Sequence, residues 1–125
     1  MKGHLGYFFG KLKWRLIWSW RGLSDNWREQ HSYRTWVWAN GVSILGLIVL
    51  PVTWIEAALI LAVGLMLLGA EALNTAIEYT VDLASPEQNP LAARAKEAGS
   101  AGVFLFSMAG GVAWVCVIGR IVWAV

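Results

Sequence analysis

The sequence of 125 residues is 58% hydrophobic and only 14% charged, with a mean hydropathy of +0.54. A water-soluble domain of this size could not bury so much apolar surface, so we expect a membrane protein with one domain, residues 1–125. The single cysteine, Cys116, excludes a disulfide framework, and two histidines beside it exclude a typical zinc site. The net charge of +2 hides an asymmetry, because basic residues gather near the N-terminus: Lys2, Lys11, Lys13, Arg15, Arg21, Arg28 and Arg34.

Residues 1–34 have the period of an amphipathic helix. Apolar side chains recur there at steps of three and four and fall within about 80° of the helix circumference. They are Leu5, Phe9, Leu12, Leu16, Trp20, Leu23 and Trp27. Lys11, Arg21, Asp25 and Arg28 fall on the opposite side. This pattern predicts a helix that lies in the membrane interface, with its cations near anionic headgroups. Packing of this helix against the rest of the protein is the alternative.

Three apolar stretches predict transmembrane helices at 36–52, 54–77 and 99–123. Lipid offers no partner for free backbone groups, so the spans should be helices and the fold class all-α. Pro51 separates the first two spans. The basic N-terminus should be cytoplasmic, which puts the 82–96 loop on the same side and the C-terminus outside. In that loop, Ser85-Pro86 and Asn89-Pro90 both predict helix starts, because each pairs a capping residue with a proline.

A stripe of polar residues marks the second span. Glu71, Asn74, Glu78 and Asp82 cover about 80° over three helical turns. A carboxylate in the middle of a span costs roughly 2.5–3.5 kcal/mol, so such a stripe indicates a functional site more than interhelical hydrogen bonding. Carboxylate and amide oxygens suit magnesium held together with phosphates.

The chemistry that these residue types favour is phosphoryl transfer. Arg94 and Lys96 add positive charge for polyphosphate oxygens on the expected cytoplasmic side. A glutamate at the membrane boundary can serve as general base for a lipid hydroxyl. Together these groups predict transfer of phosphate from a nucleotide to a lipid alcohol. No phosphate-binding loop supports this, because Gly64 and Gly69 are followed by Ala70-Glu71 rather than by Lys and Ser or Thr.

The polar stripe also carries a resemblance to a known family. The runs Glu71-Ala72-Leu73-Asn74-Thr75-Ala76-Ile77-Glu78, Val81-Asp82 and Ala95-Lys96-Glu97-Ala98-Gly99-Ser100 resemble the signature of the prokaryotic diacylglycerol kinases. Ser19-Trp20-Arg21-Gly22-Leu23 and Tyr33-Arg34 are similar to the interfacial helix of the same family. The resemblance covers nearly the whole chain. It implies a bacterial inner-membrane enzyme, multi-pass and homotrimeric, that uses MgATP to phosphorylate diacylglycerol to phosphatidic acid.

The same resemblance implies roles for individual residues. Glu71 matches the catalytic base and Glu78 a magnesium ligand. The positions that match the ATP site are Lys11, Trp18, Asn74, Glu78, Asp82, Glu87, Gln88, Asn89, Lys96 and Glu97. Those that match the lipid-substrate site are Ser19, Trp27, Tyr33, Arg34, Glu71 and Ser100. The expected partners are therefore ATP, a membrane lipid and the bilayer itself, with Mg²⁺ as cofactor and no nucleic acid.

Three positions depart from the family pattern. Where the family usually has a second metal-ligating glutamate, four residues before Arg34, this chain has Gln30, with Glu29 beside it. Magnesium would then be held by one less charge, so we expect weaker metal affinity or substitution by Glu29. Trp36 stands where some members carry an acid, and Glu97 replaces the commoner aspartate.

Other functions fit parts of the same sequence. Undecaprenol is an alternative lipid substrate, because the apolar residues that would line a lipid cleft do not separate the two alcohols. A degenerate kinase kept as a non-catalytic membrane assembly partner is a second alternative, for which Gln30 is the best support. An ion or proton carrier is disfavoured, because the acids stay at one end of their span.

Overall fold

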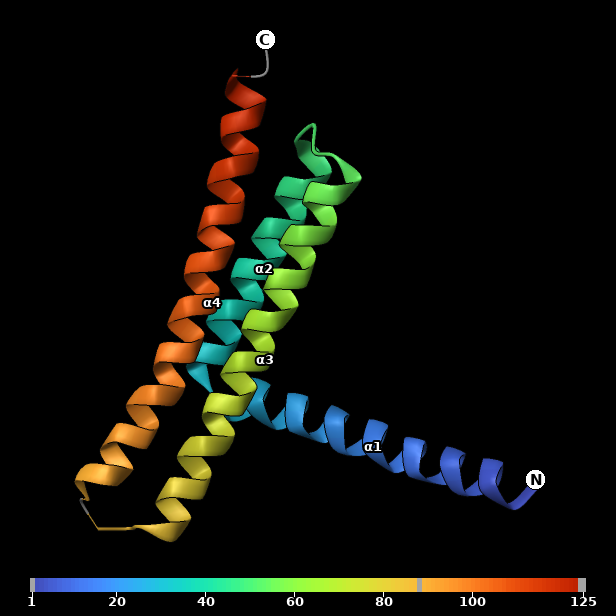
Figure 1. Ribbon diagram of the computed structural model, residues 1–125, viewed down its shortest axis with the longest axis vertical. Coiled ribbons are helices and arrows are strands. Elements are labelled where there is room, and N and C mark those ends of the chain that lie inside the picture. Colours follow the sequence, from blue (N-terminus) through green and yellow to red (C-terminus); the bar gives the residue numbers. More distant parts are fainter. Residues whose placement is uncertain (1, 88, 124–125) are drawn as a thin grey trace.

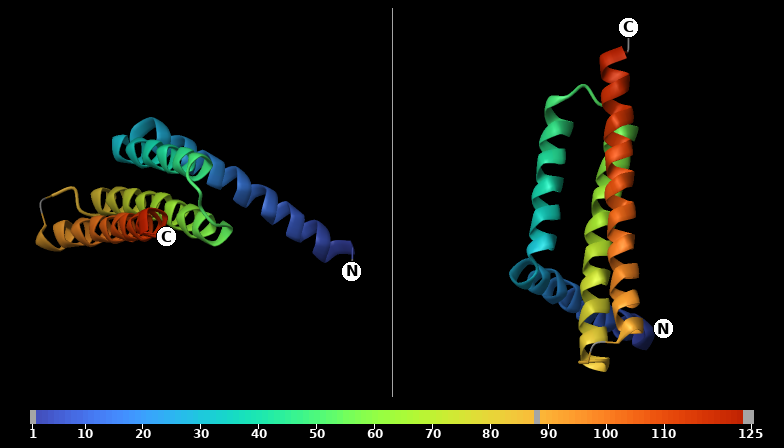
Figure 2. Two further views of the ribbon diagram at one scale, coloured as in Figure 1. Left: turned by 90° about the horizontal axis from the view of Figure 1, so that it is seen from above. Right: turned by 90° about the vertical axis from the view of Figure 1, so that its left-hand side faces the viewer.

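The computed structural model describes residues 2–87 and 89–123, with side chains described from Gly10 onward. It contains four helices: α1 (Lys2–Glu29), α2 (His31–Val49), α3 (Trp54–Ala84) and α4 (Pro90–Trp123). The residues described form no strand, so the all-α prediction is confirmed. Helices α2, α3 and α4 run alongside one another as a bundle, whereas α1 projects sideways from it (Figures 1 and 2). The α3–α4 connection lies at the end of the bundle from which α1 leaves.

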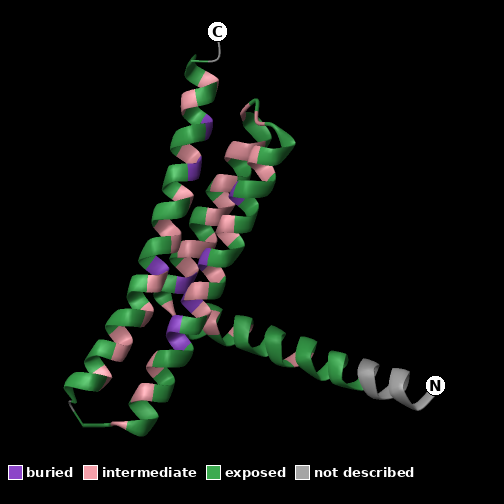
Figure 3. Cartoon of the chain, in the orientation of Figure 1, coloured by how far each residue is buried: buried purple, intermediate pink, exposed green. Residues whose placement is uncertain are grey.

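Helices α3 and α4 are long and apolar enough to cross a membrane. In each, only 17% of the most apolar 18-residue window is buried inside the protein, so these windows are not the core of a soluble fold. Figure 3 shows the same distribution, with buried residues in the bundle and the described side chains of α1 mostly exposed. Burial of this kind suits helices whose outer faces meet lipid.

The two helix boundaries predicted from proline are present. Before Pro51, α2 ends at Val49, and α3 then begins at Trp54 behind a capping box in which Thr53 and Glu56 bond to each other's backbone N–H. At the other end of the bundle, Asn89 caps α4, because its Oδ1 accepts a hydrogen bond of 2.8 Å from the Leu91 N–H.

The predicted helix start at Ser85 is wrong. Helix α3 continues past the apolar span to Ala84, and Ser85 is its C-terminal cap, with its N–H donating to the Val81 carbonyl. The Ser85 hydroxyl donates to the Glu87 carbonyl instead of capping a new helix. Since α4 begins at Pro90, as the Asn89-Pro90 signal predicted, the connection between the two helices is 85–89. Gln88 lies outside the described residues.

The predicted continuous helix over residues 1–34 is interrupted at Gln30. This residue has an extended backbone (φ −104°, ψ 112°), and α2 starts at His31, before the Trp36 start expected for the first span. The break is stabilised by Arg34, whose guanidinium donates to the carbonyls of Trp27 and Arg28 at the end of α1. Those carbonyls would otherwise lack an intrahelical partner.

Glycines allow the three bundle helices to approach closely. A Cβ added at Gly64 in α3 would lie 1.9 Å from Asn40 Oδ1 in α2, and one at Gly99 in α4 would lie 2.4 Å from Asn74 Oδ1 in α3. Neither distance is compatible with a real side chain. Small residues that admit a polar neighbour in this way are typical of helix contacts in membranes. The two asparagine–glycine contacts therefore fix the packing of α3 against α2 and against α4.

The end of the bundle farthest from α1 is held by one ion pair. Arg120 in α4 donates to both carboxylate oxygens of Glu56 in α3, at 2.6 and 2.9 Å, and to the Pro51 carbonyl. The planar guanidinium suits such a two-pronged contact with a carboxylate. This cluster ties the C-terminal part of α4 to the α2–α3 turn.

Candidate active site

The predicted polar stripe runs along one side of α3 and becomes more exposed toward its C-terminal end. Glu71 and Asn74 are buried, with 4% and 9% of their surface exposed, whereas Glu78 is half-buried and Asp82 is exposed. The spacing of three and four residues places all four on one face, as expected. The stripe therefore connects the inside of the bundle with the end where α3 meets the 85–89 connection.

Asn74 orients the middle of the stripe. Its Nδ2 donates a hydrogen bond of 2.9 Å to Glu78 Oε1, so the amide oxygen must point the other way. That oxygen is buried against Gly99 of α4 and has no hydrogen-bond partner among the described residues. Asn74 thus fixes one carboxylate oxygen of Glu78. The other oxygen has no hydrogen-bond partner in the part of the chain that the structure describes.

One turn away, Glu71 is the most buried acid of the stripe. Its backbone carbonyl accepts a hydrogen bond of 3.1 Å from the Thr75 hydroxyl, which is also buried. Its carboxylate makes no hydrogen bond or ion pair with the described side chains. Such a group is suited to exchanging a proton with a ligand hydroxyl.

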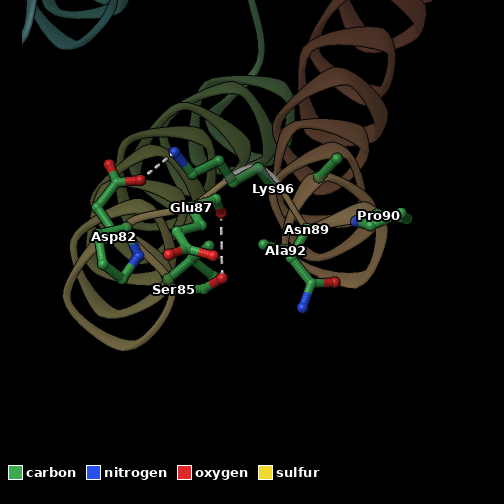
Figure 4. Close-up of a pocket in the computed structure, with 10 residues that line it drawn as sticks. Asp82, Ser85, Glu87, Asn89, Pro90, Ala92 and Lys96 are labelled. Carbon is green, nitrogen blue, oxygen red and sulfur yellow. Dashed lines mark hydrogen bonds and ion pairs between the residues drawn. The ribbon is translucent and has the colours of Figure 1, made fainter.

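A cavity of about 500 Å³ opens where the stripe ends, between the last turn of α3 and the start of α4. Its polar lining comes from Asp82, Ser85, Glu87, Asn89 and Lys96. Figure 4 shows these side chains around the opening, with the Lys96 ammonium turned toward Asp82. The two form an ion pair with an N–O distance of 2.5 Å. The lining holds two carboxylates and one lysine, a set that suits a polyphosphate carried together with a divalent cation.

The other residues expected in the ATP site are not brought to this cavity within one chain. Lys11 and Trp18 belong to α1, which projects away from the α3–α4 end of the bundle (Figure 1). Glu97 follows Lys96 but is exposed and does not line the cavity. Ser85 was not predicted as a cavity residue, because its sequence context was interpreted as a helix start.

The structure places the residues expected at the lipid site in different parts of the molecule. Ser19 lines a second cavity, of about 490 Å³, between α1 and α3. Tyr33 is buried. The ring centroids of Trp27 and Trp38 are 6.4 Å apart, and the Arg34 guanidinium is hydrogen-bonded to a carbonyl at the end of α1. Ser100 is exposed on α4.

Gln30 forms a hydrogen bond with Tyr79, a residue that the sequence did not mark as part of the site. Its Nε2 donates a hydrogen bond of 3.1 Å to the hydroxyl of Tyr79 in α3, the residue directly after Glu78. The residues are 49 positions apart, so no local pattern could have revealed the contact. Glu29 ends α1 and is exposed. Among the described residues, no three His, Cys, Asp or Glu side chains come together as a metal cluster.

This arrangement matches a class of membrane enzymes. An all-helical chain with membrane-spanning character carries a buried acid, an oriented carboxylate and a cavity suited to polyphosphate along one helix. The sequence model of the prokaryotic diacylglycerol kinases matches residues 17–118 of this chain. The chain belongs to that family.

Curated relatives agree with the family match over most of the chain. The diacylglycerol kinase of Pseudomonas aeruginosa is 38% identical over 97 residues, which are 78% of this chain and 79% of the relative. That of Escherichia coli K12 is 32% identical over 104 residues, or 80% and 81% of the two chains. The Haemophilus influenzae enzyme is 31% identical over 94 residues, or 75% and 80%.

Proposed function

We propose that this chain is an ATP-dependent lipid kinase that transfers the γ-phosphate of MgATP to diacylglycerol and yields phosphatidic acid. The observation that carries the proposal is the graded stripe on α3, which joins buried Glu71 to the cavity at Asp82 and Lys96. In this proposal the lipid hydroxyl approaches Glu71 from the α1–α3 cavity, which is lined by the neighbouring Ala72 and Thr75, and the soluble nucleotide binds at the exposed end. The relatives of similar length, all named diacylglycerol kinases, support the same substrate pair.

In this proposal each end of the stripe has its own task. The lipid hydroxyl oxygen attacks the γ-phosphorus, the bond from that phosphorus to the β–γ bridging oxygen breaks, and ADP leaves. Glu71 takes the hydroxyl proton as general base. Lys96 exchanges its ion pair with Asp82 for phosphate oxygens and stabilises the charge that spreads over them.

The donor set of the stripe fits a magnesium ion that is held together with phosphates. Such an ion keeps several waters and needs only one or two protein carboxylates, so a cluster of three acids is not required. Glu78 would hold it through its second carboxylate oxygen, and Gln30 would add a neutral amide oxygen. Mg²⁺, when bound, neutralises charge on the β- and γ-phosphates.

The replacement of a charged ligand by Gln30 has a testable consequence. Gln30→Glu adds one negative charge beside Tyr79, the residue that follows Glu78, so the magnesium concentration for half-maximal activity should fall if position 30 is a ligand. Manganese titration followed by electron paramagnetic resonance measures the same affinity without turnover. An unchanged metal affinity in both measurements would show that Gln30 does not weaken the site. The matched control Glu29→Gln removes the neighbouring charge and tests whether Glu29 substitutes.

We further propose that the chain crosses the bacterial inner membrane three times, with the N-terminus cytoplasmic and the C-terminus periplasmic. Helices α3 and α4 supply the spans 54–77 and 99–123. Span 36–52 falls largely in α2, whose Trp38, Val42 and Val49 are more than two-thirds exposed. Residues 1–34 would lie in the cytoplasmic interface. The sideways direction of α1 and its exposed tryptophans support this placement (Figure 1).

A homotrimer would complete the ATP site. Lys11 and Trp18 lie on the projecting helix α1, whereas Asp82 and Lys96 line the cavity on the α3–α4 side. Neighbouring copies arranged around an axis could bring α1 of one chain to the cavity of the next. Closed rings of this kind are the usual symmetry of homo-oligomers with head-to-tail contacts.

A substrate comparison tests the proposed activity. The purified protein in lipid nanodiscs is incubated with magnesium and ATP labelled at the γ-phosphate, with either diacylglycerol or undecaprenol added. We expect label in phosphatidic acid. Preferential labelling of undecaprenol would contradict diacylglycerol as the substrate. Absence of label in both lipids would contradict the kinase itself and leave a non-catalytic assembly role.

A further inference from the structure

Two side-chain contacts hold the corner between α1 and α2, one within the corner and one to α3. Arg34 bonds back to the carbonyls of Trp27 and Arg28, which fixes α2 on the end of α1. Gln30, the single extended residue between the helices, donates through Nε2 to the Tyr79 hydroxyl of α3. The first contact supplies hydrogen bonds to the last carbonyls of α1, and the second joins the corner to α3.

The same tyrosine lines the cavity between α1 and α3. Leu23, Ala72 and Ala76 give this cavity an apolar surface, and Ser19 and Thr75 add hydroxyl groups. Asp25 and Asn26 of α1 add a carboxylate and an amide to the polar part of the lining. The cavity is also one helical turn from Glu71, because the Thr75 hydroxyl bonds to the Glu71 carbonyl. An amphiphile with a hydroxyl at its polar end fits such a lining. The width of the cavity depends on the angle at which α1 leaves the bundle, since α1 forms one of its walls.

We propose that the Gln30–Tyr79 hydrogen bond is a latch that fixes the angle of α1 and thereby makes Tyr79 a positioning residue for the lipid alcohol in the α1–α3 cavity. A small change of angle at this hydrogen bond produces a large displacement at the far end of α1. Lys13 lies roughly 25 Å along the helix from Gln30, so a change of about 10° at the corner would move it by roughly 4 Å. The identity of the lipid rests on the proposed kinase function, whereas the latch itself does not.

The tyrosine hydroxyl can accept or donate a hydrogen bond, so a conservative substitution at Gln30 can keep the contact with Tyr79. Tyr79→Phe removes only the hydroxyl and therefore only the latch. In Gln30→Glu the tyrosine hydroxyl can donate to the new carboxylate, so the latch is kept with its polarity reversed. Thr80→Val is the matched control, because it removes a hydroxyl from the next residue, which bonds only to the Ala76 carbonyl of its own helix.

The test joins a distance measurement to steady-state kinetics. Spin labels are placed at exposed positions 13 and 83 after Cys116→Ser, and labelled chains are diluted with unlabelled protein so that each distance lies within one chain. Tyr79→Phe should broaden the distance distribution and raise the KM for diacylglycerol roughly 2- to 10-fold, the range expected for one hydrogen bond. The KM for MgATP should stay unchanged, and Thr80→Val and Gln30→Glu should keep the parent distribution.

Three results would overturn the proposal. An unbroadened distribution in Tyr79→Phe would show that no latch exists. A broadened distribution with an unchanged KM for diacylglycerol would remove the positioning role, and so would a rise confined to the KM for MgATP. If the parent phosphorylated no lipid, the kinase function would fail, but the distance measurement would still decide whether the latch exists.

Discussion

The contact between Gly99 and Asn74 gives the sharpest prediction about the site. In Gly99→Ala the new Cβ would lie 2.4 Å from Asn74 Oδ1, whereas a carbon and an oxygen in contact are usually about 3.3 Å apart or more. Either Asn74 must turn or α4 must move away from α3 by most of the remaining 0.9 Å or so. Turning Asn74 would release the hydrogen bond that orients Glu78. Both stability and magnesium dependence should therefore change.

The magnitude follows from a matched pair of variants. Overpacking a well-packed contact costs roughly 1–3 kcal/mol, while replacing a helical glycine by alanine gains roughly 0.5–1 kcal/mol. Gly102→Ala, one turn along the same helix, should show only the gain in helix stability, because nothing lies within 4 Å of its added Cβ. The difference between the two variants should thus be about 1–3 kcal/mol, since the helix-propensity gain cancels.

Unfolding in mixed micelles, followed by circular dichroism, measures this difference directly. Magnesium titration of activity in the same samples reports on Glu78. We expect Gly99→Ala to be the less stable variant and to need more magnesium, and Gly102→Ala to match the parent in its magnesium requirement. Equal stability of the two variants would refute the close approach of α4 to Asn74.

Three further predictions concern the bundle, the cavity and the assembly. Gly64→Ala, whose Cβ would meet Asn40 Oδ1, should destabilise the protein by roughly 1–3 kcal/mol relative to Gly69→Ala, which meets nothing; equal unfolding curves would contradict the contact. Lys96→Met should raise the KM for MgATP roughly 10- to 100-fold, the range for a lost charged hydrogen bond, and an unchanged KM in steady-state assays would remove Lys96 from the ATP site. Trp18→Ala and Lys96→Met chains, refolded together and assayed at an ATP concentration that gives each variant alone little activity, should show more activity than either alone; no gain in the mixture would oppose a site shared between copies.

The sequence predicted those helix boundaries that depend on local chemistry. Pro51 cannot continue a helix, and Asn89 before Pro90 supplies a side-chain cap, so both signals are independent of the rest of the fold. Ser85 had the same local signal but ends α3 instead, because the helix continues beyond its apolar span. The break at Gln30 has no proline or glycine beside it. It depends on Arg34 and on tertiary contact with α3, which a local pattern cannot show.

The candidate site was predictable to the same extent. Helical spacing is enough to align Glu71 with Asp82, and the cost of burying acids in lipid singles out the stripe as a candidate site. The close approach of the Asn74 amide oxygen to Gly99 was not predictable, because Gly99 belongs to another helix. The role of Tyr79 was not predictable for the same reason, since it is hydrogen-bonded to Gln30, which is 49 positions away. Contacts between helices thus supply the detail that periodicity lacks.

The general base is the central claim, and Glu71→Gln separates it from binding. The substitution keeps the size of the side chain but removes its ability to take a proton, so the transfer rate should fall roughly 10²- to 10⁴-fold. Binding of MgATP, measured by calorimetry on the protein in nanodiscs, should stay at the parent affinity. Glu56→Gln, at the opposite end of the same helix, should keep the parent rate. A Glu71→Gln protein that phosphorylates diacylglycerol as fast as the parent would contradict the account.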